Sequence, residues 1–322
     1  MSETKTETYD TTAGDALRGE VRTILAAEGK SQVDLARESG VAYGTFTGWL
    51  SGKYEGNNAK VEEKISNWLQ ARRQNASVAA TLPASPRFQL TATSERIVSL
   101  LQWAKVAGDT GIVVGVPGVG KSTTFKQFTA TNPNVWMVTL EPCTKGINQV
   151  LVRLCEAMSV TEKRPTYLST AIGAFVRDKG GLIIIDEAQH ASMDALDQIR
   201  CIPDQYSCGV VLGGHQSVFA RLSNGSNSNY AQLTSRVGMR LTLSKPRRHD
   251  IDTLLKAWAV EDKDIAKQLH FYAGKPGALR VIDKVMKLAH LLAIGAGEDL
   301  QLKHIKAAYS QLAHHDQTDN SA

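Results

Sequence analysis

The positions of apolar residues divide this chain of 322 residues into three stretches. Up to about residue 73 they recur at intervals of three and four, which predicts amphipathic helices. From residue 94 to residue 244, short and nearly continuous apolar runs alternate with helical stretches, as in a protein with buried parallel strands. After Pro246 the pattern is helical to about His314. We therefore expect an α/β domain between two helical domains.

Five apolar runs are the expected strands of the α/β domain, because β-branched residues in short runs favour buried strands. They are GIVVGV (111–116), VWMVTL (135–140), GLIIIDE (181–187), GVVLGG (209–214) and MRLTL (239–243). The segment before them, SERIVSLLQWAKVAG, predicts a helix that begins with Ser94 as its N-cap.

Polar and proline-containing stretches set the expected domain boundaries. These are a disordered tail over 1–16, a helix-turn-helix domain over 17–73, a linker over 74–93, a nucleotide-binding domain over 94–244, a helical lid over 245–314 and a tail over 315–322.

Residues 115–122 read GVPGVGKS and match the pattern G-x-x-x-x-G-K-[ST] between an expected strand and an expected helix. Glycines let successive backbone N–H groups point at phosphate oxygens, and the helix N-terminus adds positive potential. We expect Lys121 to reach the β- and γ-phosphates of ATP and the Ser122 hydroxyl to ligate Mg²⁺. The candidate nucleotide-binding residues are Gly115, Val116, Pro117, Gly118, Val119, Gly120, Lys121, Ser122, Thr123 and Asp186.

A second motif, LIIIDEAQH over 182–190, is an apolar strand that ends in two carboxylates. This pattern predicts that Asp186 joins Ser122 on the metal and that Glu187 activates the attacking water. The strand GVVLGG ends at His215, or Gln216, where a polar sensor is expected.

Phosphoryl transfer also needs cations that stabilise the transition-state charge. Arg236, in SRV before the last expected strand, is the candidate for an arginine finger that reaches the neighbouring subunit, and Arg221 is the reserve. Arg280, in PGALR, is the candidate for a sensor arginine that reaches the γ-phosphate from the lid.

Residues 31–53 have the pattern of a helix-turn-helix. Val33, Leu35 and Ala36 are expected to face inward, with a left-handed turn at Gly40. The candidate DNA contacts of this domain are Tyr43, Thr45, Thr47, Lys53 and Lys60.

Composition adds limits to this picture. The chain is 42% hydrophobic and 21% charged, with no apolar run long enough to span a membrane and no secretory signal, so we expect a protein of the host bacterial cytoplasm. Its four cysteines lack metal-site spacing. The net charge of +5 favours contact with a phosphate backbone only slightly, and Lys145, Lys163 and Arg164 are the candidate contacts in the α/β domain.

The motifs and their order resemble those of the family of the target-DNA activator B protein of bacteriophage Mu. Members of this family are AAA+ transposition ATPases. The resemblance is carried by KYEGNNAKV, NPNVWMVT, GLIIIDEAQH, GVVLGGH, SRV and KPGALR. It implies ATP-dependent helical filaments on double-stranded DNA with little sequence preference, delivery of that DNA to a DDE transposase, and hydrolysis stimulated by DNA. His215 departs from the family pattern, where asparagine is usual.

Two other functions are compatible with the same motifs. The chain could be a helicase loader or replication initiator whose helix-turn-helix reads a specific origin, or a regulator that binds ATP as a switch and hydrolyses it negligibly.

Overall fold

The computed structural model describes residues 11–81, 83–216 and 237–318, with the side chains of 11–13, 77–81 and 313–318 excepted. The chain forms two compact units, Met1–Pro83 and Ala84–Ala322. Within the described residues, no helix is long and apolar enough to cross a membrane.

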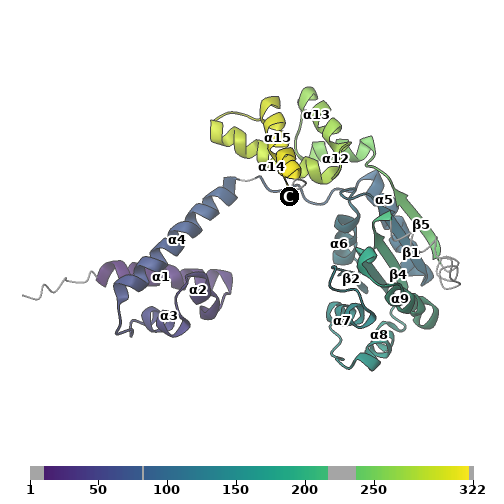
Figure 1. Cartoon of the computed structure of the whole chain (residues 1–322), viewed down its shortest axis with the longest axis horizontal. Helices are drawn as coiled ribbons and strands as arrows, with labels where there is room; N and C mark the ends of the chain where they lie inside the picture. Colours follow the sequence, from purple (N-terminus) through teal and green to yellow (C-terminus); the bar gives the residue numbers. More distant parts are fainter. Residues whose placement is uncertain (1–10, 82, 217–236, 319–322) are drawn as a thin grey trace, which may run out of the picture. The chain divides into compact units, whose positions relative to one another are not determined.

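The described residues of the first unit form four helices (Figure 1). They are α1 (Thr11–Glu28), α2 (Gln32–Glu38), α3 (Tyr43–Leu50) and α4 (Asn58–Thr81). Their apolar stripes form one core around Phe46, Trp49 and Ile65, each fully buried. The helical periodicity of the sequence is therefore explained by packing between these four helices.

A helix-turn-helix lies within this unit. Ser31 and Asp34 form a capping box at the start of α2, and Gly40 makes the turn to α3 with φ of +65°. The prediction for Val33 was wrong, because its side chain is 52% exposed while Leu35 and Ala36 are buried. Val33 and Leu35 are two residues apart, about 200° around the helix axis, so Val33 lies on the side of α2 away from the core.

Both ends of the first unit contain more helix than the expected tail and linker. Helix α1 begins at Thr11, inside the segment 1–16, and Gly14 lies so close to α4 that a Cβ there would be 2.4 Å from the Glu62 carboxylate. Helix α4 continues to Thr81, inside the expected linker. Alanine-rich sequence sustains this helix, and Pro83 follows its end.

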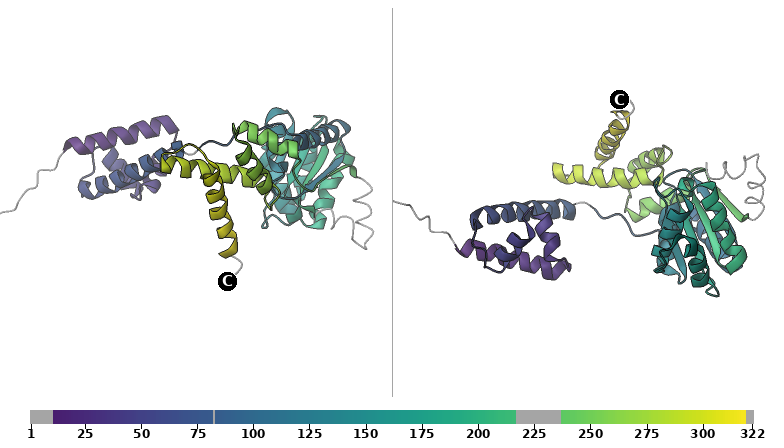
Figure 2. Two further views of the ribbon diagram at one scale, coloured as in Figure 1. Left: turned by 90° about the horizontal axis from the view of Figure 1, so that it is seen from above. Right: turned by 60° about the horizontal axis from the view of Figure 1, so that its bottom comes forward.

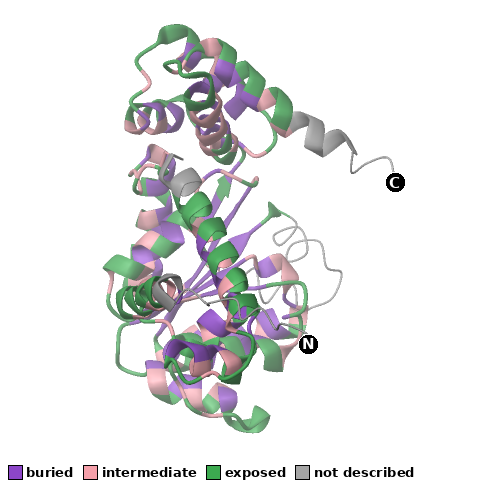
Figure 3. Ribbon diagram, turned by 90° about the vertical axis from the view of Figure 1, so that its left-hand side faces the viewer, coloured by how far each residue is buried: buried purple, intermediate pink, exposed green. Residues whose placement is uncertain are grey.

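The α/β domain contains one five-stranded parallel sheet with strand order β2-β3-β4-β1-β5. The strands are β1 (Thr110–Gly115), β2 (Val135–Thr139), β3 (Leu182–Asp186), β4 (Gly209–Gly214) and β5 (Val237–Leu243). All five expected strands are confirmed. Every residue of β1, β3 and β4 is buried, and Figure 3 shows buried strands at the centre of the domain.

Helices cover both faces of this sheet, as Figure 2 shows. Alternate strand residues separate into two apolar clusters, one under α5 and α6 and the other under α7, α8 and α9. These helices are α5 (Ala92–Ala107), α6 (Lys121–Thr131), α7 (Ile147–Met158), α8 (Leu168–Val176) and α9 (Met193–Tyr206). The three layers fix the carboxyl ends of β1, β3 and β4 along one edge.

Helix α5 begins three residues earlier than its sequence suggested. Thr91 is the N-cap, and Ser94 occupies the third helical position, where its hydroxyl accepts a hydrogen bond from the Thr91 backbone N–H at 2.6 Å. The Thr91 hydroxyl in turn accepts from the Ser94 backbone N–H. The two residues form a reciprocal capping box, so a serine at the third position was mistaken for the cap itself.

The lid is a separate helical cluster after β5. It contains α12 (Arg248–Ala257), α13 (Lys263–Ala273), α14 (Leu279–Ala296) and α15 (Leu302–Thr318). The fully buried Asp250 connects the lid to α5, since its carboxylate accepts from the backbone N–H and the hydroxyl of Thr93 and from the Arg247 N–H. A buried carboxylate with three donors is a rigid connection.

Candidate functional site

The loop between β1 and α6 has the geometry of a phosphate-binding loop. Gly118 and Gly120 have φ of +84° and +96°, values that residues with a side chain rarely adopt. The loop leads directly into the N-terminus of α6. The Lys121 ammonium donates to the carbonyls of Gly115 and Val116 at 2.8 and 3.1 Å. Burial lowers the pKa of Lys121, and the nearby carboxylates of Asp186 and Glu187 oppose that shift.

Asp186 and Ser122 lie together beneath this loop. Asp186 is 1% exposed at the end of β3, and its carboxylate accepts hydrogen bonds from the Ser122 hydroxyl and, at 3.0 Å, from the backbone N–H of Glu187. Burial raises the pKa of Asp186. A carboxylate beside a hydroxyl, at the mouth of a phosphate loop, fits Mg²⁺, which prefers few protein oxygens and completes its shell with phosphate and water.

Glu187 follows directly, in a left-handed conformation with φ of +54°. Its carboxylate accepts a hydrogen bond from the Gln189 side-chain amide. The oxygen of the same amide accepts from the backbone N–H of His215 at 3.1 Å, just past the end of β4. Gln189 was not singled out in the sequence, although it stands in the same motif.

The lid closes the other side of this loop. Its helix α14 starts with a distorted turn, Gly277 at φ of +95° and Ala278 at φ of +47°, and the buried Ala278 packs into the apolar cluster of α5 and α6. The backbone N–H of Leu279 donates to the Gly118 carbonyl at 3.1 Å. Arg280, predicted as a lid sensor, follows on the same turn.

These elements surround one cavity of about 720 Å³, which is large enough for a nucleotide. Glu187, Gln189, His215 and Arg280 line it together with the phosphate loop. Further lining residues from the lid and from the segment before α5 were not expected: Ser85, Pro86, Arg87, Phe88, Gln89, Leu254, Leu279 and Asp283. The segment classed as linker is thus also a wall of the candidate nucleotide site.

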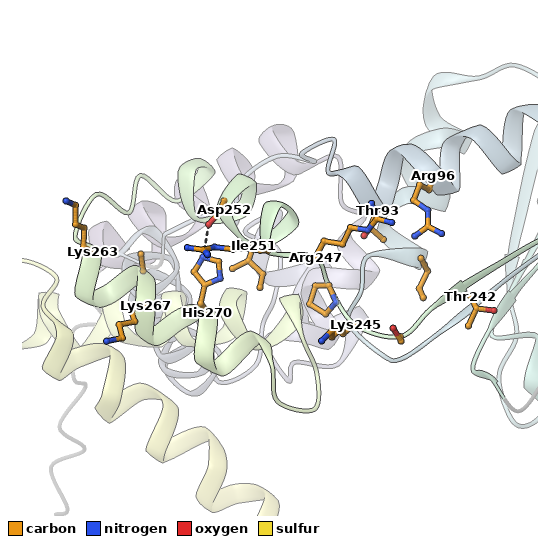
Figure 4. Close-up of a pocket in the computed structure, with 15 residues that line it drawn as sticks. Thr93, Arg96, Thr242, Lys245, Arg247, Ile251, Asp252, Lys263, Lys267 and His270 are labelled. Atoms are coloured by element: carbon orange, nitrogen blue, oxygen red, sulfur yellow. Dashed lines mark hydrogen bonds and ion pairs between the residues drawn. The ribbon is translucent and has the colours of Figure 1, made fainter.

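A second cavity, of about 1180 Å³, lies between α5, the end of β5, α12 and α13 (Figure 4). We call it the basic pocket. Its cationic lining residues are Arg96, Lys245, Arg247, Arg248, Lys263 and Lys267. The carboxylate in its lining is that of Asp252, which pairs with His270 at 2.6 Å. The pocket therefore has a strong excess of positive charge, which the sequence analysis did not foresee.

The other predicted contacts lie elsewhere on the two units. Tyr43, Lys53 and Lys60 are exposed in the first unit, whereas Thr45 and Thr47 are half-buried, and the Thr47 hydroxyl donates to carbonyls of its own helix.

In the α/β domain, Lys145, Lys163 and Arg164 are exposed. Arg164 pairs with Glu162 at 2.8 Å and lies over the Tyr167 ring. The hydrogen bonds from Arg164 hold the pKa of Glu162 at about 2. Arg236 and its reserve Arg221 lie outside the described residues, so the trans arginine stays a prediction.

Comparisons with known proteins agree with this architecture. Residues 107–222 match the family model described as an AAA domain. Residues 235–312 match the model described as Mu B transposition protein, C terminal.

Full-length relatives extend the similarity over most of the chain. It is 30% identical over 299 residues to the ATP-dependent target DNA activator B of Escherichia phage Mu, covering 92% of this chain and 95% of the relative. The corresponding protein of Escherichia phage D108 matches to the same extent. The Mu-like prophage FluMu DNA transposition protein B of Haemophilus influenzae is 31% identical, over 78% of this chain and 88% of its own.

Solved structures share the fold. The Drosophila ORC bound to DNA matches with a TM-score of 0.52 and 14% identity, over 71% of this chain and 63% of that one. A Walker-type ATPase of Pyrococcus abyssi matches with a TM-score of 0.50 and 11% identity, over 74% and 76%.

Proposed function

The chain belongs to the family of the phage Mu target-DNA activator B, and from this we propose that it is a DNA-stimulated ATPase that assembles on target DNA and delivers it to a DDE transposase. Little dependence on DNA sequence is part of the proposal. Its self-association is expected to be helical and to require ATP.

The nucleotide cavity supports ATP binding and hydrolysis. Lys121 and the N–H groups of the phosphate loop would hold the phosphates, and Ser122 and Asp186 would hold Mg²⁺. The metal would neutralise charge on the phosphate oxygens. Glu187 would take a proton from the attacking water, and Arg280 would stabilise charge on the γ-phosphate from the lid.

The basic pocket is the main support for DNA binding. It is the observation on which the proposal of a DNA-binding function, in addition to ATP hydrolysis, depends. A cluster of exposed cations with a single carboxylate releases condensed counterions when it meets a phosphate backbone, and it reads no base sequence. Asp250 joins the lid to α5 beside this pocket, so the pocket walls contributed by α5 and α12 are held together.

The helix-turn-helix offers little for reading bases. Glycines occupy two positions of α3, and Thr47 is engaged with its own backbone. Side chains that form two hydrogen bonds with one base edge discriminate between bases in the major groove. None of these side chains occurs in α3, all of whose residues the structure describes. These features favour binding of the DNA backbone over recognition of an origin.

Electron microscopy of the full chain with ATP and plasmid DNA tests the proposal. Filaments of indefinite length are the expected result. Closed rings, together with protection of one defined DNA site in competition with random fragments, would favour a helicase loader or initiator. Turnover measured with and without DNA is the second arm, and negligible turnover in both would favour an ATP-operated switch.

A further inference from the structure

Gln189 lies between two groups that a hydrolysis site must coordinate. It belongs to the short 3-10 turn Ala188–His190, directly after Glu187, and it is half-buried at the wall of the nucleotide cavity. Its side-chain amide contacts the Glu187 carboxylate on one side and the His215 backbone on the other.

The orientation of this amide follows from its partners. The His215 backbone N–H can only donate, so it requires the amide oxygen, and the amide nitrogen is then the atom that donates to the Glu187 carboxylate. Each contact therefore fixes the other. An aspartate or glutamate at this position would repel Glu187, and an apolar residue would leave both partners without the contact.

The two partners belong to different strands. Glu187 follows β3, and its left-handed backbone turns the carboxylate out of the strand direction. His215 follows β4, the neighbour of β3 in the sheet. The Glu187 side chain can adopt several rotamers. The Gln189 amide, which is hydrogen-bonded both to Glu187 and to the backbone after the neighbouring strand, restricts that side chain to fewer of them.

We propose that Gln189 is a positioning residue that holds the Glu187 carboxylate in the orientation needed to activate water and sets it against the end of β4. This inference rests on the proposed ATP hydrolysis and assigns Gln189 no contact with the reacting atoms. In this proposal the backbone N–H of His215 has a role that does not depend on its imidazole. That imidazole is exposed, and it stands where asparagine is usual in the family.

The test compares two substitutions of Gln189 in the full chain with saturating DNA. Gln189→Ala removes both contacts. Gln189→Glu keeps the length of the side chain and an oxygen that accepts from His215, but it places a negative charge beside Glu187. Both should lower kcat about tenfold or more, as is typical when the outer partner of a reactive group is lost, with the ATP KM and Kd within about twofold of wild type.

His190→Gln is the matched control, because His190 is the next residue of the same turn and does not line the cavity. It should hydrolyse ATP as the wild type does. Melting temperatures of all variants establish that they are folded. If Gln189→Glu turns over ATP at the wild-type rate or faster, the amide donor is not needed and the inference is wrong.

A double-mutant cycle separates positioning from a general structural role. In the Glu187→Gln background, adding Gln189→Ala should cost less than about twofold further in kcat, because the group that Gln189 orients is already lost. Full additivity would overturn the inference. If Glu187→Gln alone hydrolyses normally, the role of Glu187 in the proposed function fails instead, which is a different result.

Discussion

The backbone N–H of Leu279, at the start of the lid helix α14, donates to the carbonyl of Gly118 in the phosphate loop at 3.1 Å. The approach is so close that a Cβ on Gly118 would lie 1.9 Å from the Gly277 carbonyl oxygen, a distance at which backbone must move. Lid and phosphate loop are thus in direct backbone contact, and a change at one reaches the other without any intervening side chain.

Gly118→Ala should therefore separate the lid from the phosphate loop. We expect ATP affinity to fall by more than about tenfold, since the new methyl group adds a backbone clash to the strain at φ of +84°. Gly297→Ala is the control, because Gly297 ends the same lid helix at φ of +67° with open space around it. Fluorescent nucleotide titration measures both, and equal affinities would argue against the clash.

Asp186→Asn should stabilise the protein that contains no nucleotide while abolishing Mg²⁺-dependent ATP binding. Burial raises the pKa of Asp186, so the folded state binds a proton more tightly than the unfolded state does. Stability contributed by this group is complete below the ordinary aspartate pKa of 3.8 and is lost as pH rises through the folded value. The ionised carboxylate is thus unfavourable at neutral pH.

Thermal unfolding over a pH series measures this effect. The melting temperature of Asp186→Asn should exceed that of the wild type at neutral pH, and the difference should vanish in acid. The variant keeps an oxygen for the Glu187 N–H, so lost packing does not confound the comparison. A lower melting temperature at neutral pH would mean that the attraction to Lys121 outweighs burial.

The features that depend on neighbouring residues alone, such as the strands and the phosphate loop, could mostly be predicted from the sequence. The strands β1 to β4 coincide with nearly continuous apolar runs, and the phosphate loop is one uninterrupted motif, so both could be predicted from neighbouring residues alone. The basic pocket could not be predicted, because Arg96 and Lys267 lie far apart in the sequence and only the fold brings them together. Gln189 could not be predicted for another reason: the role proposed for it depends on His215, which follows β4, the strand beside β3 in the sheet.

Glu187→Gln should lengthen the lifetime of ATP-dependent DNA complexes. Removing the carboxylate slows the activation of water, whereas the phosphate loop, Ser122 and Asp186 stay intact and Mg·ATP remains bound. The measurement is the decay of complexes on DNA after ATP is diluted away, with Lys121→Ala as the variant that should form no such complexes. Faster decay than in the wild type would contradict the role given to Glu187.

The last prediction concerns the basic pocket, where Lys263 and Lys267 occupy successive turns of α13 and are both exposed. Among the residues that the structure describes, neither has an ion-pair partner, so neither charge is already neutralised within the unit. Each ammonium that meets a phosphate releases about one condensed counterion. The double variant Lys263→Ala/Lys267→Ala should weaken DNA binding equally on all sequences and lower the slope of log affinity against log salt by about 2.

Lys256→Ala is the control for a charge outside the pocket, since Lys256 is an exposed lysine of the lid that does not line the basic pocket. It removes one charge and the double variant removes two, so affinity losses are compared per charge removed. Removing it should change the salt slope by much less than one unit. Affinity measured between low and moderate salt, on random fragments of equal length and with ATP present, distinguishes the two surfaces. If the double variant and the control lose the same affinity per charge removed, with unchanged slopes, net charge alone accounts for the loss. The cations that contact DNA would then have to be sought among Lys145, Lys163 and Arg164, on the α/β domain, or among the exposed lysines of the first unit.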